Sequence, residues 1–161
     1  MTKILLSLHV LAAIIAIGPV TVAASMFPPA ARRVAVPVPA GAGEGTDAGD
    51  VSTVRLLHRI CRVYAGLGIA VPVLGFATAA AMGVLGDAWL IASIALTAAA
   101  AGLLVAFVLP RQEELLEQLT DRQPVERART ARLAMFTGLF NLLWATVTVL
   151  MIVRPGSTTG A

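Results

Sequence analysis

The sequence predicts an all-α integral membrane protein, a four-helix bundle formed by one transmembrane domain over residues 1–161. The first observation is composition: 58% of the residues are hydrophobic and only 13% are charged, whereas soluble domains average about 45–50% apolar and about 25% charged residues. A chain with so few polar residues cannot cover a globule in water, so lipid is the expected surrounding. The second observation is that apolar residues gather in four long stretches, the expected spans: 4–27, 60–84, 88–109 and 133–153.

The first stretch, Ile4–Phe27, contains no Asp, Glu, Lys or Arg and runs for about 24 residues. At about 1.5 Å per residue it forms about 36 Å of helix, enough to cross a hydrocarbon core of about 30 Å with some tilt. An alternative interpretation makes residues 1–24 a cleaved signal peptide. Its charged region would consist of Lys3 alone, and its apolar run is longer than the usual run of about 7–15 residues. We therefore expect this stretch to remain as a span.

The proline, glycine and charged residues predict the structure of the segments that connect the four spans. Residues 28–51 begin with two prolines and continue with glycine and small residues, a composition typical of a flexible loop. Pro72 is expected to kink the second span, and the short turn after that span makes the second and third spans an antiparallel pair. Residues 111–132 combine acids, arginines and leucines and predict a charged cytoplasmic helical hairpin, with Pro124 in the first turn of its second helix. The tail 155–161 is expected to be disordered.

The basic residues predict the orientation of the four spans. Both termini lie on one side of the membrane, with Lys3 and Arg154, and the first and third connections lie on the other. The remaining basic residues, all arginines, fall on the side of these two loops: Arg32, Arg33, Arg55, Arg59, Arg62, Arg111, Arg122, Arg127, Arg129 and Arg132. Cytoplasmic loops carry an excess of Lys and Arg. The bias predicts two cytoplasmic loops and two extracytoplasmic termini (N-out/C-out) in a bacterial plasma (inner) membrane.

Small residues recur at helical spacing in the second and third spans. They form three sets: Gly75, Ala79 and Gly83; Ala88, Ala92 and Ala95; and Ala98, Gly102 and Ala106. Faces of this kind let another helix approach closely. They predict tight packing between helices, in a homo-oligomer or in a larger membrane complex.

His9 is the one ionisable side chain well inside an apolar stretch, roughly 8 Å below the outer surface by helical rise. Ionisable residues within a membrane often serve as cofactor ligands, proton relays or gates. The alternative is a neutral histidine that bonds to a neighbouring helix. Met82 and Met151 are the partners expected at its depth, and a histidine with methionines can ligate a haem iron or a soft copper ion. His9, Met82 and Met151 are therefore the candidate metal site, and haem is the candidate cofactor at His9.

Three further polar residues receive structural interpretations. His58 and Cys61 stand among arginines at the start of the second span, and we expect both at the membrane boundary, His58 near the lipid headgroups. Helical rise separates His58 from His9 by roughly 20 Å in depth, which excludes a haem held between them. Asn141 lies near the middle of the fourth span and is expected to bond across helices, as a polar packing residue.

Missing motifs narrow the function. No Asp or Glu occurs inside any of the four stretches, which disfavours a proton-coupled exporter. The sequence has no HExxH, GxSxG, P-loop or dinucleotide fingerprint, so we name no catalytic residue and expect no enzyme. Basic residues do not alternate with aromatic ones, so no nucleic-acid partner is expected. The expected partners are the lipid bilayer and other membrane helices.

Three segments carry a resemblance: KILLSLHVLAAIIAIGPVTVAAS, RLLHRICRVYAGLGIAVPVLG and LPRQEEL. They resemble a family of small four-span bacterial proteins known only as predicted integral membrane proteins of unknown function. More distantly, the Leu-His start of the first span is similar to copper-resistance D-type proteins and to haem-binding membrane oxidases of protoporphyrinogen. That likeness implies a cofactor ligand at His9. The glycine-rich, tryptophan-containing sequence that usually follows is replaced here by Ile-Gly-Pro-Val.

We therefore expect a non-enzymatic multi-pass membrane protein, an accessory or helix-packing subunit of a membrane complex. The small-residue faces and the lack of catalytic motifs favour this hypothesis. The alternative is a haem- or metal-binding membrane redox protein that uses His9 near the outer surface. A small transporter is the third hypothesis.

Overall fold

The computed structural model describes residues 2–35 and 45–156, with side chains from residue 51 in the second range. Every described element is a helix, which confirms the all-α prediction. In chain order they are α1 (Thr2–Val34), α2 (Gly45–Leu67), α3 (Ala70–Met82), α4 (Ala88–Leu103), the π-helix η1 (Leu104–Val108), α5 (Leu109–Thr120) and α6 (Arg127–Val153).

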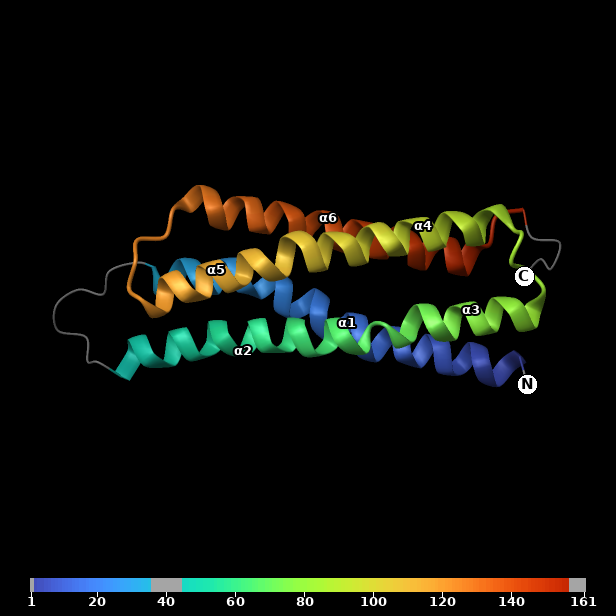
Figure 1. The fold of residues 1–161 in the computed structure, drawn as a ribbon, viewed down its shortest axis with the longest axis horizontal. Coiled ribbons are helices and arrows are strands. Elements are labelled where there is room, and N and C mark those ends of the chain that lie inside the picture. The colour runs from blue at the N-terminus through green and yellow to red at the C-terminus, as the bar shows by residue number, and fades with distance from the viewer. Residues whose placement is uncertain (1, 36–44, 157–161) are drawn as a thin grey trace.

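The helices form an elongated bundle of four rods (Figure 1). One rod is α1, the next is α2 followed by α3, the third is α4 with η1 and α5, and the last is α6. The start of α1, the end of α6 and the α3–α4 turn lie at one end of the bundle, the terminal end; the α5–α6 link lies at the opposite end, the loop end. Within the described residues, four helical stretches are long and apolar enough to cross a membrane: Thr2–Val34, Val51–Met82, Ala88–Thr120 and Arg127–Val153.

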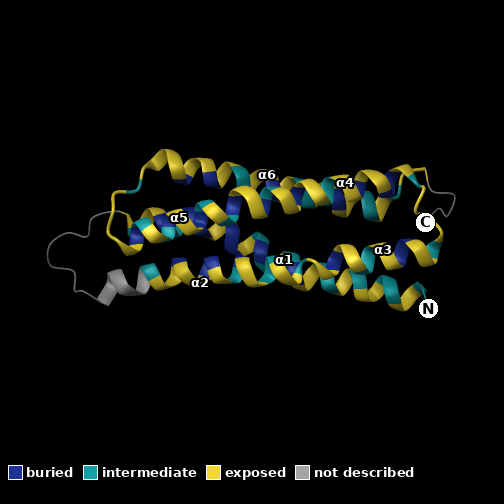
Figure 2. Cartoon of the chain, in the orientation of Figure 1, coloured by how far each residue is buried: buried dark blue, intermediate teal, exposed yellow. Residues whose placement is uncertain are grey.

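The outer surface of the bundle is largely apolar. Figure 2 shows exposed residues along the outward faces of the helices. Among them, the aliphatic side chains of Ile14, Ile69 and Ile152 are 64, 67 and 74% exposed. Such surfaces are unfavourable in water and favourable in hydrocarbon. The chain is therefore a multi-pass membrane protein whose helices contact the lipid bilayer.

The larger of two apolar cores joins all four rods. Its largest fully buried apolar side chains are Phe27 of α1 and Leu133 and Phe140 of α6. A smaller cluster at the terminal end joins Ala79 of α3 to Trp89 of α4. Because lipid tails are as apolar as these side chains, close packing and interhelical hydrogen bonds hold the rods together within the membrane.

Trp89 also makes polar contacts that stabilise the terminal end of the bundle. Its indole Nε1–H donates to the Asp87 carboxylate at 2.9 Å, and the Arg154 guanidinium lies 5.7 Å from the centre of the ring system. The contact joins the start of α4 to the end of α6. An aromatic ring with polar partners suits the membrane–water interface.

The structure differs from the sequence prediction at the first connection. The helix α1 passes through the two prolines and continues to Val34, and α2 already begins at Gly45. Both ends of the predicted flexible loop over 28–51 are therefore helical, and residues 36–44 lie outside the described part of the chain. Packing is the physical reason: Phe27, directly before the prolines, is fully buried, and helical backbone can persist where packing supports it despite the two hydrogen bonds that prolines remove.

The second rod breaks where Pro72 predicts a kink. The break lies between Leu67 and Ala70, which are the end of α2 and the start of α3. Pro72 has no N–H to donate to the Gly68 carbonyl. That carbonyl instead accepts from the N–H of Val71, at 3.1 Å.

The third rod continues past the predicted end of the span at residue 109, in agreement with the helix expected in the first half of the 111–132 segment. Pro110 lacks the N–H that an α-helix directs to the carbonyl of Ala106, and the chain widens into η1 directly before this proline and continues as α5. Within the predicted hairpin over 111–132, Pro124 lies in the extended link before α6, so its predicted place in the first helical turn is wrong. In the tail, residues 157–161 lie outside the described part of the chain.

Candidate functional site

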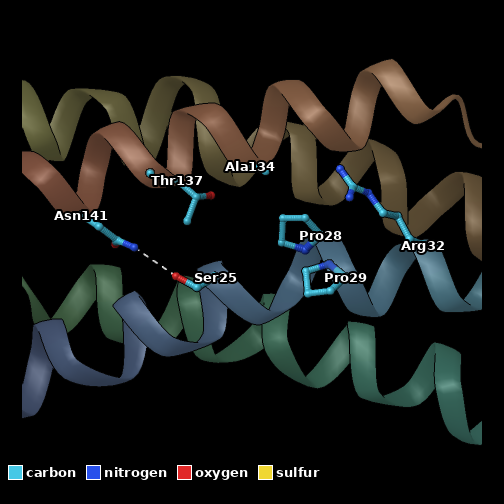
Figure 3. A pocket seen from close by; sticks show the side chains of 8 residues that line it. Ser25, Pro28, Pro29, Arg32, Ala134, Thr137 and Asn141 are labelled. Atoms are coloured by element: carbon cyan, nitrogen blue, oxygen red, sulfur yellow. Dashed lines mark hydrogen bonds between the residues drawn. The ribbon is translucent and has the colours of Figure 1, made fainter.

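A groove opens between α1 and α6 (Figure 3), with a volume of about 210 Å³. Each helix contributes four of the lining residues. These are Ser25, Pro28, Pro29 and Arg32 from α1, and Ala134, Thr137, Gly138 and Asn141 from α6. Small side chains keep it open, and polar atoms without partners gather in it. We therefore treat it as the candidate functional site.

The prolines add main-chain polarity to the α1 side of the groove. In an α-helix each carbonyl accepts a hydrogen bond from the N–H four residues later, and proline has no N–H. Pro28 and Pro29 therefore leave the carbonyl oxygens of Ala24 and Ser25 without a helical donor. Main-chain acceptors in an apolar segment need another partner, so this level of α1 favours a hydrogen-bonding neighbour.

Asn141 reaches across the groove from α6. Its amide Nδ2–H donates to Ser25 Oγ at 3.0 Å, the dashed line in Figure 3. Its other amide atom, Oδ1, is buried without a partner. The hydroxyl of Thr137, a residue only 3% exposed, is also buried without a partner. Buried polar atoms almost always have hydrogen-bond partners, so these two atoms leave hydrogen-bonding capacity unused in the wall of the groove.

Arg32 supplies a positive charge at the loop end of the groove. Its Nε–H donates to Thr130 Oγ1 of α6 at 3.0 Å, and in Figure 3 its guanidinium extends toward α6. No carboxylate of the described residues lies within ion-pair distance of this guanidinium. The groove thus combines one cation with a hydroxyl donor, a pattern suited to an anionic oxygen ligand.

A second hollow, of about 350 Å³, lies between α5 and α6. Its charged lining carries both signs: Arg111, Arg129 and Arg132 with Glu114 and Glu126. Glu126 lies 3.7 Å from Arg129, and the Arg111 guanidinium stacks on a phenylalanine ring. The charges in this second hollow are therefore largely compensated by neighbouring lining residues. The Arg32 guanidinium differs, because it has no carboxylate neighbour among the described residues.

His9 lies against α3, outside the groove. Its Nδ1 is 3.0 Å from the carbonyl oxygen of Val71. A carbonyl can only accept, so Nδ1 carries the hydrogen. In the neutral ring this leaves Nε2 as a lone-pair atom, the arrangement that metal-ligating histidines use.

The predicted methionine partners lie elsewhere. His9 contacts α3 at Gly75, and Met82 is seven residues further along that helix, about 10 Å by helical rise. Met151 packs beside the Trp89 cluster at the terminal end. Within the described residues, no group of three or more His, Cys, Asp or Glu side chains is arranged to hold a metal ion. Of the three predicted ligands, His9 is therefore the one that stays a candidate, because its Nε2 lone pair is available to a metal.

The expectation that the His58 side chain lies among lipid headgroups is wrong, because His58 is buried inside the bundle, as is Cys61 three residues later on α2. Their depth at the membrane boundary stays a prediction. Gln112 of α5 joins them: its Oε1 is 3.2 Å from His58 Nδ1, and its Nε2–H donates to Cys61 Sγ at 3.6 Å. Gln112 is itself fully buried, while His58 Nε2 has no partner. Sequence reasoning missed Gln112, although its position one turn before Leu115 places it on the apolar face of α5.

The structure also places His58 far from His9. His9 bonds to Val71, thirteen residues after His58 along the second rod, which is about 20 Å by helical rise. The two histidines therefore belong to separate environments. Asn141, the predicted packing residue, makes its interhelical bond to Ser25 in the groove.

We found no relative of this chain among known proteins. No protein family matches this chain, and neither a curated protein nor a solved structure matches it.

Proposed function

We propose that this protein is a non-enzymatic helix-packing subunit of a membrane assembly and that it packs through α4. The observation that carries the proposal is an exposed stripe of small residues along this helix. Its members are separated alternately by four and three residues: Ala88, Ala92, Ala95, Ala99 and Gly102 of α4, and Ala106 of the adjoining η1. All six are exposed, whereas Trp89, Ser93 and Ala100 of the same helix are buried inside the bundle.

Gly102 is the most informative member of the stripe. A β-carbon added there would meet no atom within 4 Å, so the fold of this chain does not require glycine at that place. Glycine in a helix interior costs about 1 kcal/mol relative to alanine. A close approach by a helix from outside the chain would explain this glycine, because small residues let helix backbones come together in lipid.

The small residues of α3 are used differently. Gly75 accommodates the His9 ring, and Ala79 is buried in the terminal cluster. Gly83 ends α3 with a φ of +71°, a left-handed conformation that favours glycine. The α3 set therefore serves packing and capping within the chain, which leaves α4 as the face for another helix, in a second copy or a different subunit.

The test is association in membranes before and after the stripe is filled. We expect Gly102→Leu and Ala95→Leu to abolish in-membrane cross-linking and the higher-mass species seen by native mass spectrometry. Ala101→Leu is the matched control, because it adds the same side chain to an exposed position of α4 outside the stripe. Equal association of all three variants, or a wild-type protein that is monomeric and partner-free in its native membrane, overturns the proposal.

A redox role at His9 is the second candidate, supported by the tautomer that the Val71 carbonyl selects. A haem or soft metal ion would bind Nε2, and further ligands would come from outside the described residues or from another chain. Optical spectra and metal analysis of protein purified from its native membrane test this. A Soret band or bound metal that disappears in His9→Ala supports the role, and a colourless, metal-free protein opposes it.

A further inference from the structure

The groove between α1 and α6 lies where the apolar part of each helix gives way to charge. The apolar stretch of α1 ends at Phe27 and is followed by Arg32 and Arg33, and on α6 it begins at Leu133 after a run of arginines. The Arg32 guanidinium is therefore at the depth of lipid headgroups. Ser25 lies two helical turns deeper, about 10 Å by helical rise, among the acyl chains.

Thr137 is the polar group that the fold leaves unused. Threonines within helices commonly bond back to the carbonyl four residues earlier, and Thr146 and Thr148 of this same α6 do so, at 2.8 and 2.9 Å. The Thr137 hydroxyl makes no such bond although it is buried. Thr137 lines the groove. It lies seven residues after Thr130, the α6 residue that Arg32 contacts, and therefore about 10 Å deeper by helical rise.

The walls between these polar groups are small and open to lipid. Ala134 and Gly138 of α6 and Pro29 of α1 are exposed. A β-carbon at Gly138 would meet no atom within 4 Å, so a larger side chain there would occupy the groove itself. An occupant therefore has an anionic head beside Arg32, a hydrogen-bond acceptor about 10 Å deeper at the level of Thr137, and an apolar remainder.

We propose that this groove binds an anionic phospholipid, with its phosphate on the Arg32 guanidinium and an ester carbonyl on the Thr137 hydroxyl. In a phospholipid the glycerol esters lie directly below the phosphate, in the order in which the groove presents its guanidinium and its hydroxyl. The acyl chains then follow the exposed faces of α1 and α6 into the membrane. The site is separate from the α4 stripe, so a result that overturns one of the two proposals leaves the other unaffected.

Native mass spectrometry of the full chain in mild detergent tests the site. The probes are phosphatidylglycerol and phosphatidylcholine with identical acyl chains, and inorganic phosphate as competitor. We expect the wild-type protein to prefer phosphatidylglycerol. Arg32→Gln should weaken phosphatidylglycerol binding about tenfold, the effect of one charge-assisted hydrogen bond. Thr137→Val, which keeps the side-chain shape, should weaken the binding of both lipids about threefold by removing one neutral hydrogen bond.

Arg33→Gln is the matched control, because Arg33 is the exposed neighbour of Arg32 and does not line the groove. It should change phosphatidylglycerol binding less than about twofold, as expected of a screened surface charge. Gly138→Leu should block binding with every polar group intact, and unchanged helicity and unfolding temperature verify that it folds. Equal losses in Arg32→Gln and Arg33→Gln, or no headgroup preference in the wild type, overturn the proposal. Displacement of the lipid by equimolar inorganic phosphate also overturns it, since that identifies a site for a soluble anion.

Discussion

The imidazole of His9 fits against Gly75 so closely that a β-carbon on Gly75 would lie 2.8 Å from the imidazole Cε1. The ring is held there by its Nδ1–H, which donates to the carbonyl of Val71, one turn earlier on α3. One glycine thus permits the contact that fixes the tautomer of the histidine. The small residue at this position serves a polar contact as well as helix packing.

Gly75→Ala should therefore displace His9 and destabilise the α1–α3 contact. We expect a loss of about 1–3 kcal/mol in unfolding free energy, the usual cost of adding a methyl group to a tightly packed site. Thermal or denaturant unfolding in detergent measures it. Gly66→Ala is the control, because Gly66 lies in a helix with nothing within 4 Å of the added carbon; it should be neutral or slightly stabilising. Equal effects of the two substitutions would mean that the His9 contact contributes nothing.

Gln112→Ala should loosen the region between α2 and α5. The substitution leaves the buried His58 Nδ1 and Cys61 Sγ without their partner, at an expected cost of about 1–3 kcal/mol. Cys61 is fully buried, so a maleimide should label it only when the protein opens locally. Labelling in native membranes should be slow for the wild type and at least several-fold faster for Gln112→Ala.

Arg55→Cys in a Cys61→Ala background is the control for that measurement. Arg55 is exposed and lies on the same helix before the predicted span, so its thiol should react quickly in either the presence or the absence of Gln112. Rapid labelling of Cys61 in the wild type would contradict its burial.

The membrane character of the fold was predictable because the length and hydropathy of a stretch decide whether it can cross lipid. The burial of His58 was not predicted, since its neighbours Arg55 and Arg59 suggested a boundary position. A helical signal was nevertheless present. Val54, His58 and Cys61 are spaced four and three residues apart, on a face turned about 100° from that of the arginines, and all three are buried.

The groove was missed for a different reason. Its α1 wall exists only because the helix continues past Pro28 and Pro29, and local propensity predicts that two adjacent prolines end a helix. Tertiary packing around Phe27 overrides that propensity. Ser25, Thr137 and Asn141 were recognisable as polar residues in spans, but their convergence with Arg32 follows from the pairing of α1 with α6, which no local pattern specifies.

The arginine distribution predicts that the loop end of the bundle is cytoplasmic. In a Cys61→Ala background, Lys3→Cys places a thiol at the terminal end and Gln123→Cys places one in the α5–α6 link; both positions are exposed. A membrane-impermeant maleimide should label Lys3→Cys in intact spheroplasts and Gln123→Cys only after permeabilisation. The opposite pattern would reverse the orientation, and equal labelling would mean mixed insertion.

Asn141 and Ser25 form an interhelical hydrogen bond whose strength can be isolated from the rest of the groove. A double-mutant cycle with Asn141→Ala and Ser25→Ala should give a coupling energy of about 0.6 kcal/mol, and no more than about 1.7 kcal/mol, the range measured for such pairs in membranes. Unfolding by denaturing detergent supplies the four free energies. Thr146→Val combined with Ser25→Ala is the control cycle, because the Thr146 hydroxyl bonds to the Leu142 carbonyl of its own helix, and its coupling should be zero. A coupling near zero for Asn141 as well would mean that lipid or water replaces Ser25 at no cost, so that the groove is held open by helix packing alone.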